Sequence, residues 1–183
     1  MKRLGQSNIE QILDRALLLG DTGVMKIICH AALIFNCERA PIFELMVDAG
    51  SFPKCFTGFG LIPAIRSIRL AEPLAVGVIR HIYNADNSVL IEKVTLLDRP
   101  KRHSYTLSGF QAPFSWLVSQ GESDWQLCQH ANTTHVSWTY GFTLTSVLLY
   151  PMGFVLLKFF MQGAMQRCLA NMSELLNATK KPD

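Results

Sequence analysis

Charged residues are scarce in this chain, and neither sign forms a large cluster. Of the 183 residues, 17 are Lys or Arg and 14 are Asp or Glu, which gives a formal net charge of only +3. The densest basic group, Arg99-Pro100-Lys101-Arg102, contains three cations. Nucleic-acid-binding proteins normally carry a basic stripe with aromatic residues between the cations. The sequence therefore predicts no nucleic-acid partner.

Cysteines are few, odd in number and without a pattern. No CxxC or Cys/His ligand spacing occurs among the five, which excludes a disulfide framework and a structural zinc site. We expect buried, inert thiols in a reducing compartment, and hence a cytoplasmic protein with no metal and no cofactor. The start of the chain has no apolar h-region or small-residue cleavage site, so no signal peptide is expected. The cysteines are Cys29, Cys37, Cys55, Cys128 and Cys168.

The common catalytic signatures are also absent. The chain has no GxSxG, Walker A, GxGxxG or HExxH motif and no Cys–His nucleophile pattern. This disfavours several enzyme classes, but acid–base catalysis needs no such motif and stays open.

No uninterrupted apolar run is long enough to span a membrane. The longest candidate, residues 147–161, is shorter than the roughly 20 residues that a spanning helix needs. It is also interrupted by Pro151, Gly153 and Lys158. We expect no transmembrane segment here, and instead a helix that is buried or faces a partner.

What the chain does have is ample apolar sequence, 49% of its residues, in an ordered series of expected elements. An amphipathic helix over residues 7–19 precedes a strand over 24–37, and proline at position 41 suits the first turn of a short helix over 41–48. A second short helix follows Gly50. Six strands then come in succession, joined by marked turns, and a long helix over 151–177 ends the series. The six strands are expected over 64–70, 75–84, 89–97, 102–109, 116–129 and 133–145.

Several strings in this series resemble the START-like (SRPBCC) superfamily, which includes polyketide cyclase/dehydrase-like proteins. Ala40-Pro41-Ile42-Phe43-Glu44-Leu45 with Phe52-Pro53-Lys54 is similar to the superfamily's entry into its two small helices. Val76-Gly77-Val78-Ile79-Arg80 resembles its VGxxR strand, and Val136-Ser137-Trp138 its final VxW strand. The match covers roughly residues 24–176.

The resemblance implies an α+β helix-grip fold. A curved antiparallel seven-stranded sheet would wrap around the long C-terminal helix, with two short helices after the first strand and an extra N-terminal helix. We expect residues 1–22 as an amphipathic extension, 23–178 as the ligand-binding domain and 179–183 as a tail. A cavity between sheet and helix is the family's usual ligand site.

Strand parity then predicts which polar side chains face that cavity. If residues 85–87 form a three-residue hairpin loop, Arg80 lies opposite Glu92 and Ile82 opposite Leu90. With a loop at residues 98–101, Leu96 would face His103 and Val94 would face Tyr105. Buried ions are costly unless paired, so Arg80 and Glu92 are the sharpest ligand-binding candidates. A structural salt bridge is the alternative interpretation, as is a register that places both in solvent.

The remaining candidates are weaker. Arg66 would be a second anion contact if it alternates inward with Ile68, and a cation at the cavity mouth or on the sheet edge is the equal alternative. Trp116 is an aromatic wall candidate. Tyr105 could hydrogen-bond a ligand, and His103 could move a proton, although a position near an exposed strand end fits His103 better. Glu92, His103 and Tyr105 are thus the catalytic candidates if the protein is an enzyme.

Three functions remain open from the sequence. The first is binding or transport of a small hydrophobic or amphipathic ligand, lipid-like or polyketide-like. The second is a cyclase or dehydratase that uses acid–base catalysis on a polyketide-like or aromatic substrate. The third is a protein- or membrane-interaction module: the first half of the long helix is apolar nearly all round and needs a cover, either the N-terminal helix, a homodimer partner or a membrane surface.

Overall fold

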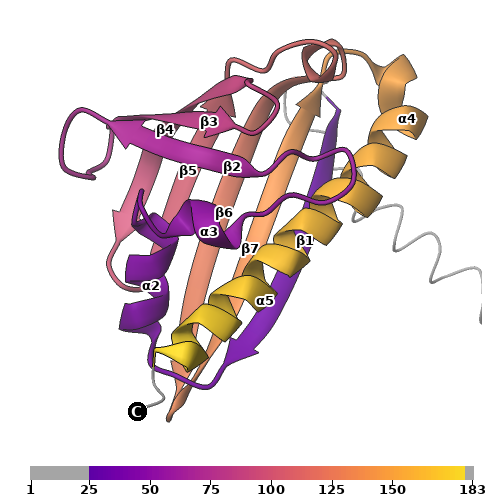
Figure 1. The fold of residues 1–183 in the computed structure, drawn as a ribbon. Coiled ribbons are helices and arrows are strands. Elements are labelled where there is room, and N and C mark those ends of the chain that lie inside the picture. The colour runs from indigo at the N-terminus through magenta and orange to yellow at the C-terminus, as the bar shows by residue number, and fades with distance from the viewer. Residues whose placement is uncertain (1–24, 180–183) are drawn as a thin grey trace, which may run out of the picture.

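The computed structural model describes residues 25–179. The expected N-terminal helix, and the expected tail beyond Thr179, lie outside the described residues. Within them the chain forms the predicted order of one strand, two short helices, six strands and a long C-terminal helix (Figure 1). The α+β helix-grip architecture predicted from the sequence is therefore confirmed.

Seven antiparallel strands form a single sheet in the order β1-β7-β6-β5-β4-β3-β2. Strands β2 to β7 follow one another as a meander, and β1 pairs with β7 at one edge. Register shifts between Ile65 and Ser67, Val94 and Leu96, and Val118 and Gln120 mark bulges. Bulges bend a sheet, and these help it curve. The strands are β1 (Lys26–Phe35), β2 (Ile65–Leu70), β3 (Ile79–Asn84), β4 (Val89–Asp98), β5 (Arg102–Ser108), β6 (Val118–His130) and β7 (Thr133–Leu144).

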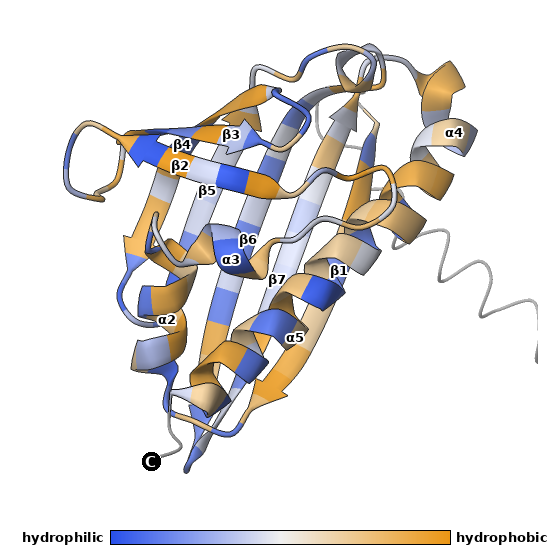
Figure 2. Ribbon diagram, in the orientation of Figure 1, coloured by the Kyte–Doolittle hydropathy of each residue, from blue (hydrophilic) through white to orange (hydrophobic). Residues whose placement is uncertain are grey.

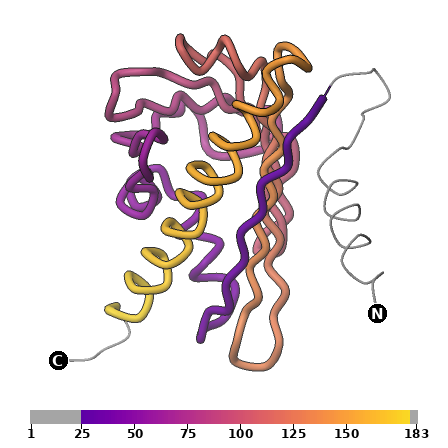
Figure 3. The backbone as a smooth tube through the Cα atoms, turned by 90° about the vertical axis from the view of Figure 1, so that its right-hand side faces the viewer, coloured from indigo at the N-terminus to yellow at the C-terminus, as the bar shows by residue number. Residues whose placement is uncertain are grey.

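The α2, α3 and C-terminal helices all lie on one face of the sheet (Figures 1 and 3). Helix α2 (Arg39–Val47) and helix α3 (Phe52–Cys55) sit beside the C-terminal helix, which crosses the sheet as α4 (Tyr150–Val155), a π-helical turn η3 (Leu156–Met161) and α5 (Gln162–Ala178). The sequence predicted one continuous helix and did not reveal the π turn.

The core lies between α5 and the inner face of the sheet. The helix contributes an apolar stripe at four-residue spacing, with Ala164, Cys168 and Met172 fully buried. Opposite, Trp125 and Trp138 stack with their ring centroids 4.0 Å apart, and Phe52 of α3 meets Trp125 edge-on. Between α5 and the part of the sheet around Trp125, the space between the two layers is filled by the aromatic side chains of the strands and the apolar side chains of the helix. We call this part of the sheet the solid end.

Close approach of the helix to the sheet depends on Gly153 in α4. A Cβ at this position would lie 3.1 Å from Ile27 Cδ1 and 3.1 Å from Leu144 Cδ2. Glycine therefore lets the start of the helix pack directly on the two strands at the β1 edge.

Two expected strand boundaries are wrong. Trp116 lies in a 3-10 turn η1 (Phe114–Trp116) and not in a strand, since β6 begins at Val118. The third predicted strand begins at Ile79 and not at residue 75, because Gly77 takes a positive φ of 92° that ends the extended backbone there.

Candidate functional site

Away from the solid end, the sheet and the helix enclose a cavity of about 570 Å³. Small-molecule sites typically measure 300 to 1,000 Å³, so this space suits a ligand of that class. Its walls are mainly apolar and aromatic. The aromatic lining residues are Phe52, Phe56, Tyr105, Phe110, Phe114, Trp116, Trp138, Tyr140 and Phe142.

The two candidate ions form a buried pair at the cavity wall. Arg80 pairs directly with Glu92 across β3 and β4, as strand parity predicted. The Arg80 Nε atom donates to Glu92 Oε1 at 2.6 Å, and Nη2 lies 2.5 Å from the same oxygen. Both side chains are almost fully buried. The third contact of the guanidinium is a 3.2 Å hydrogen bond from Nη1 to the Val47 carbonyl at the end of α2.

Only the carboxylate of this pair reaches the cavity. Glu92 is among the lining residues, whereas Arg80 is not. Burial raises the pKa of the Glu92 carboxyl, and the charge and hydrogen bond of Arg80 offset only part of that rise. Arg80 thus stands behind Glu92 and holds it in place, rather than offering its own charge to a ligand.

Tyr105 also lines the cavity, beside Tyr140. Their ring centroids lie 6.3 Å apart, and both rings are buried. Burial raises the pKa of both phenols, and the nearby charge of Glu92 raises them further, so both stay protonated. A protonated phenol can donate a hydrogen bond, which suits recognition of a ligand oxygen.

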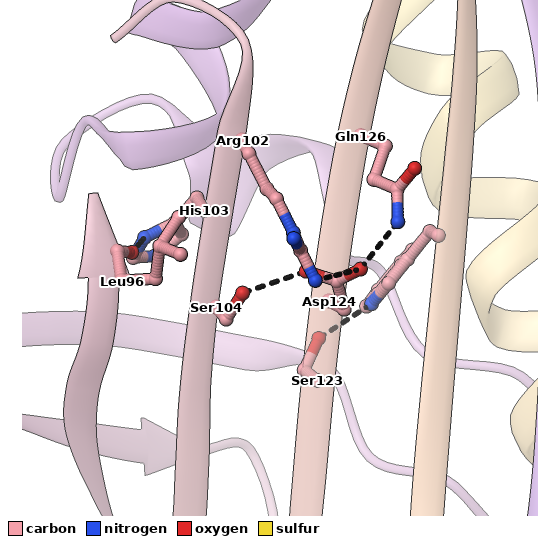
Figure 4. A network of polar contacts seen from close by, with 8 residues as sticks. Leu96, Arg102, His103, Ser104, Ser123, Asp124 and Gln126 are labelled. Carbon is pink, nitrogen blue, oxygen red and sulfur yellow. Dashed lines mark hydrogen bonds and ion pairs between the residues drawn. The ribbon is translucent and has the colours of Figure 1, made fainter. Parts of the chain in front are cut away.

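His103 is not where the sequence placed it. The expected position near an exposed strand end is wrong, because the side chain is 1% exposed. The bulge between Val94 and Leu96 moves the register by one, so His103 pairs with Leu97 and not with Leu96. Its ring turns toward β4 and its Nδ1 lies 3.2 Å from the Leu96 carbonyl oxygen (Figure 4).

This environment keeps the imidazole neutral. Burial, followed by the charge of Arg80, lowers the pKa of His103 from 6.5 to about 4. The Nε2 atom is buried without a hydrogen-bond partner among the described residues. His103 does not line the cavity, but it lies directly behind a residue that does, since its ring centroid is 5.3 Å from that of Tyr105.

Of the two remaining ligand-binding candidates, Trp116 lines the cavity and Arg66 does not. The inward alternation expected for Arg66 is wrong, because the bulge after Ile65 turns its side chain outward, where Nη1 donates to Asn87 Oδ1 at 3.2 Å. Arg66 does not line the cavity. Trp116 does line it, at the rim, with 71% of the residue exposed.

Sequence reasoning missed the loop residues that wall the cavity. Phe110 and Phe114 lie in the loop between β5 and β6, with ring centroids 5.2 Å apart, and Phe114 meets Phe142 of β7 edge-on. Leu61 comes from the loop before β2, and Met152 from α4. The only available signal was that the β5–β6 loop is rich in aromatic residues and carries no charge.

The outer face of the sheet has a different character. Asp124 accepts hydrogen bonds from Arg102 at 2.8 Å, Ser104 at 2.6 Å and Gln126 at 2.8 Å (Figure 4). Partial burial acts to raise the pKa of Asp124, but these hydrogen bonds outweigh it and lower the pKa. The network borders an open hollow of about 360 Å³. Arg102, Ser104 and Gln126 all donate to the same carboxylate, which indicates a structural network.

No metal centre is built into the described chain. Among residues 25–179, no group of three or more His, Cys, Asp or Glu side chains is placed to hold an ion. The carboxylate and phenols of the cavity offer hydrogen bonds to an organic molecule.

One helix, Val147–Ala178, is long and apolar enough to cross a membrane by length and composition. A core helix of a soluble protein passes the same test, and this helix packs on the sheet through Leu157, Met165 and Leu169, all fully buried. In its most apolar 18-residue stretch, however, only 17% of the residues are buried. Much of the apolar surface of this helix is therefore uncovered by the described residues.

Comparison with solved structures identifies the architecture. Norcoclaurine synthase from Thalictrum flavum, in complex with dopamine and hydroxybenzaldehyde, superposes with a TM-score of 0.63 over 90% of this chain and 94% of that one, at 11% identity. The chain has the START-like helix-grip fold. Ara h 8.0201 matches with a TM-score of 0.57 at 16% identity, covering 83% of this chain and 99% of its own.

A further START-like match is the protein XoxI from Bacillus cereus, with a TM-score of 0.59 at 21% identity, over 85% of this chain and 99% of that one. No protein-family model matches the sequence, and no curated protein sequence is detectably similar. At these identities the likeness establishes the fold, and function has to be argued from the site.

Proposed function

We propose that this chain is a cytoplasmic protein that binds or carries a small, mainly apolar ligand, lipid-like or polyketide-like, in the cavity between its sheet and its C-terminal helix. The observation that carries the proposal is the cavity itself: about 570 Å³, walled by aromatic side chains, with one buried carboxylate, Glu92, in its lining and a second, exposed one, Asp86. An unfilled apolar space of this size removes packing contacts from the core, and a bound ligand would restore them.

Polar groups in the wall would orient the ligand. Glu92 would accept a hydrogen bond from a ligand hydroxyl or amine, while Tyr105 would donate to a carbonyl or ether oxygen. Arg80 favours the charged form of the carboxylate and fixes its position, since the guanidinium is held by Glu92 and by the Val47 carbonyl. The START-like fold of norcoclaurine synthase, crystallised with dopamine and hydroxybenzaldehyde, supports a ligand with an aromatic ring.

A matched pair of variants on β4 tests this function. Leu90 lines the cavity, and its neighbour Ile91 points to the opposite, exposed face. We expect native mass spectrometry of the purified chain to detect a small molecule bound one-to-one, and Leu90→Trp to reduce its occupancy by filling the space. Ile91→Trp should leave occupancy unchanged. A wild-type chain that carries nothing and binds no member of a lipid and polyketide panel would contradict the proposal.

A second candidate, an acid–base enzyme of the cyclase or dehydratase type, is favoured by one observation. Glu92 is a carboxylate with a raised pKa that lines an apolar cavity, as a general base requires. Its ion pair with Arg80 stabilises the charged form and so reduces its basicity. Because His103 lies outside the cavity lining, Glu92 and Tyr105 would carry the proton transfers. Turnover of a bound ligand that Glu92→Gln abolishes while binding persists would establish catalysis.

A further inference from the structure

Four large apolar side chains form an exposed stripe along the first part of the C-terminal helix. Leu148, Met152, Val155 and Phe159 are each more than half exposed, and Leu148 reaches 86%. Leu148 lies in the 3-10 turn η2 (Val147–Leu149), which leads directly into α4, and Phe159 lies in the π-helical turn η3 that follows α4. Met152 and Val155, three residues apart, share one face of α4 between them. In Figure 2 the ribbon of α4 is largely coloured as hydrophobic, whereas α5 mixes hydrophobic and hydrophilic residues.

The stripe continues into the rim of the cavity. Met152 both belongs to it and lines the cavity, and two other exposed apolar residues, Leu61 and Trp116, line the cavity from separate loops. We call these six residues the mouth surface: Leu61, Trp116, Leu148, Met152, Val155 and Phe159. The three most exposed large apolar side chains of the described chain, Leu148, Trp116 and Leu61, belong to this surface, and three of its members line the proposed ligand site.

The segments that carry the mouth surface contain almost no charge. Residues 56–65, 109–121 and 144–157 contain no Asp, Glu, Lys or Arg, although the whole chain has 31 such residues, 17 basic and 14 acidic. The nearest cation on the helix is Lys158, and its Nζ atom donates to the Ile28 carbonyl of β1. Only Phe159 of the mouth surface has a charged neighbour in the sequence, and that charge is bound to the sheet.

Asp86 is the one charged residue that both lines the cavity and is exposed, and it lies in the β3–β4 loop, outside the three segments that carry the mouth surface. An apolar surface with a tryptophan at its rim has the chemistry of a membrane-inserting surface. Charged groups are costly to bring into the hydrocarbon region of a bilayer, whereas tryptophan favours the membrane–water interface. We propose that the mouth surface docks on a lipid bilayer by partial insertion, so that the cavity opens toward the lipid phase. The exchange of an apolar ligand at this opening rests on the proposed function, but the docking itself does not.

Vesicle flotation tests the proposal with the full chain. We expect the wild-type monomer to float with neutral phosphatidylcholine vesicles, and to do so about equally at low and high salt, because no charge attraction is involved. Leu148→Glu/Val155→Glu should lower the partition coefficient about tenfold for each side chain. The matched control is Ile34→Glu/Val76→Glu, which changes two apolar residues away from the mouth that are 62% and 61% exposed, close to the 61% of Val155, and it should float like wild type.

Tryptophan fluorescence supplies a second readout. Trp125 and Trp138 are buried, so vesicles should shift to the blue mainly the emission of Trp116, and Trp116→Phe should remove the shift. Leu148 and Val155 do not line the cavity, so the mouth variant should retain bound ligand in native mass spectrometry. Vesicle binding by a chain without ligand, or ligand binding by a chain that does not float, would separate the two proposals.

Several results would overturn membrane docking. One is a wild-type monomer that stays in solution beside neutral vesicles, and another is a mouth variant that floats as well as the control. Binding only to anionic vesicles with loss at high salt would mean electrostatic attachment instead. A concentration-dependent dimer that the mouth variant disrupts, without vesicle binding, would assign this surface to a second copy of the chain.

Discussion

The Arg80–Glu92 pair allows a quantitative test of how the cavity wall is held. Both side chains are at most 4% exposed, and two guanidinium nitrogens lie within 2.6 Å of one carboxylate oxygen. Removing one partner of a buried pair leaves an uncompensated charge and typically costs about 3–5 kcal/mol. We expect Arg80→Met to lower the free energy of unfolding by about that amount at pH 8, measured by urea denaturation.

The cost should depend on pH in a defined direction. The folded-state pKa of Glu92 is already raised above its usual value of 4.5, and removing Arg80 raises it further. A carboxyl with a raised folded pKa contributes stability below its unfolded pKa and loses it as pH rises from about 4.5 through the folded pKa. Because both chains share the unfolded pKa, the penalty of Arg80→Met should change only between the two folded pKa values, and there it should fall by up to about 1.4 kcal/mol per pH unit as the pH is lowered. Glu92→Gln should show no such relief, because arginine keeps its proton.

The double variant completes the cycle. Arg80→Met/Glu92→Leu, measured beside the single variants Arg80→Met and Glu92→Leu, removes both charges, and replacing a whole buried pair by apolar groups is often neutral. We expect it to be more stable than Arg80→Met alone, with a coupling of about 2 kcal/mol or more. The reasoning is refuted if Arg80→Met costs less than about 1 kcal/mol, or if the two single costs simply add.

Two further predictions concern stability. The folded-state pKa of His103 is about 4, against 6.5 for a free histidine, so the neutral imidazole contributes stability above pH 6.5 that is lost as the pH falls toward 4. Between pH 7 and pH 4 the free energy of unfolding of wild type should therefore fall by about 3 kcal/mol more than that of His103→Leu. Equal losses in the two chains would contradict a neutral buried imidazole. In α4, Gly153→Val should lower stability by about 1–3 kcal/mol in thermal melts because its side chain would collide with Ile27 and Leu144, whereas a stabilised Gly153→Val chain would show that the helix can move off the sheet.

The hairpin register could be predicted where turns are well marked. The loop at residues 85–87 is flanked by clear strands, so the facing of Arg80 with Glu92 followed from counting alone. Asn87 in this loop has a positive φ of 69°, a backbone conformation that asparagine adopts more readily than most residues. Period-2 alternation then places every second residue of both strands inward.

Counting failed where a bulge intervenes. An extra residue between Val94 and Leu96 changes the partner of His103, and another after Ile65 turns Arg66 outward. Nothing in the local residue types separates a bulged strand from a regular one, because a bulge satisfies the geometry of the whole sheet. The burial of His103 and the exposure of Arg66 therefore required coordinates.

Loop contributions to the site were also beyond prediction. Phe110, Phe114 and Leu61 come from segments with no periodicity, so no face could be assigned to them. They meet over the cavity only because strands far apart in the chain lie in one sheet. The mouth surface could not be predicted for the same reason, since its members are spread from residue 61 to residue 159 and come together only in the fold.

The central claim, that sheet and helix enclose a space for one apolar guest, is tested most directly by titrating the chain with 1-anilinonaphthalene-8-sulfonate and following its fluorescence. The account predicts saturable binding at one site, retained by Ile91→Trp and lost in a folded Leu90→Trp chain. Binding without saturation, or an identical titration curve for Leu90→Trp and wild type, would contradict it.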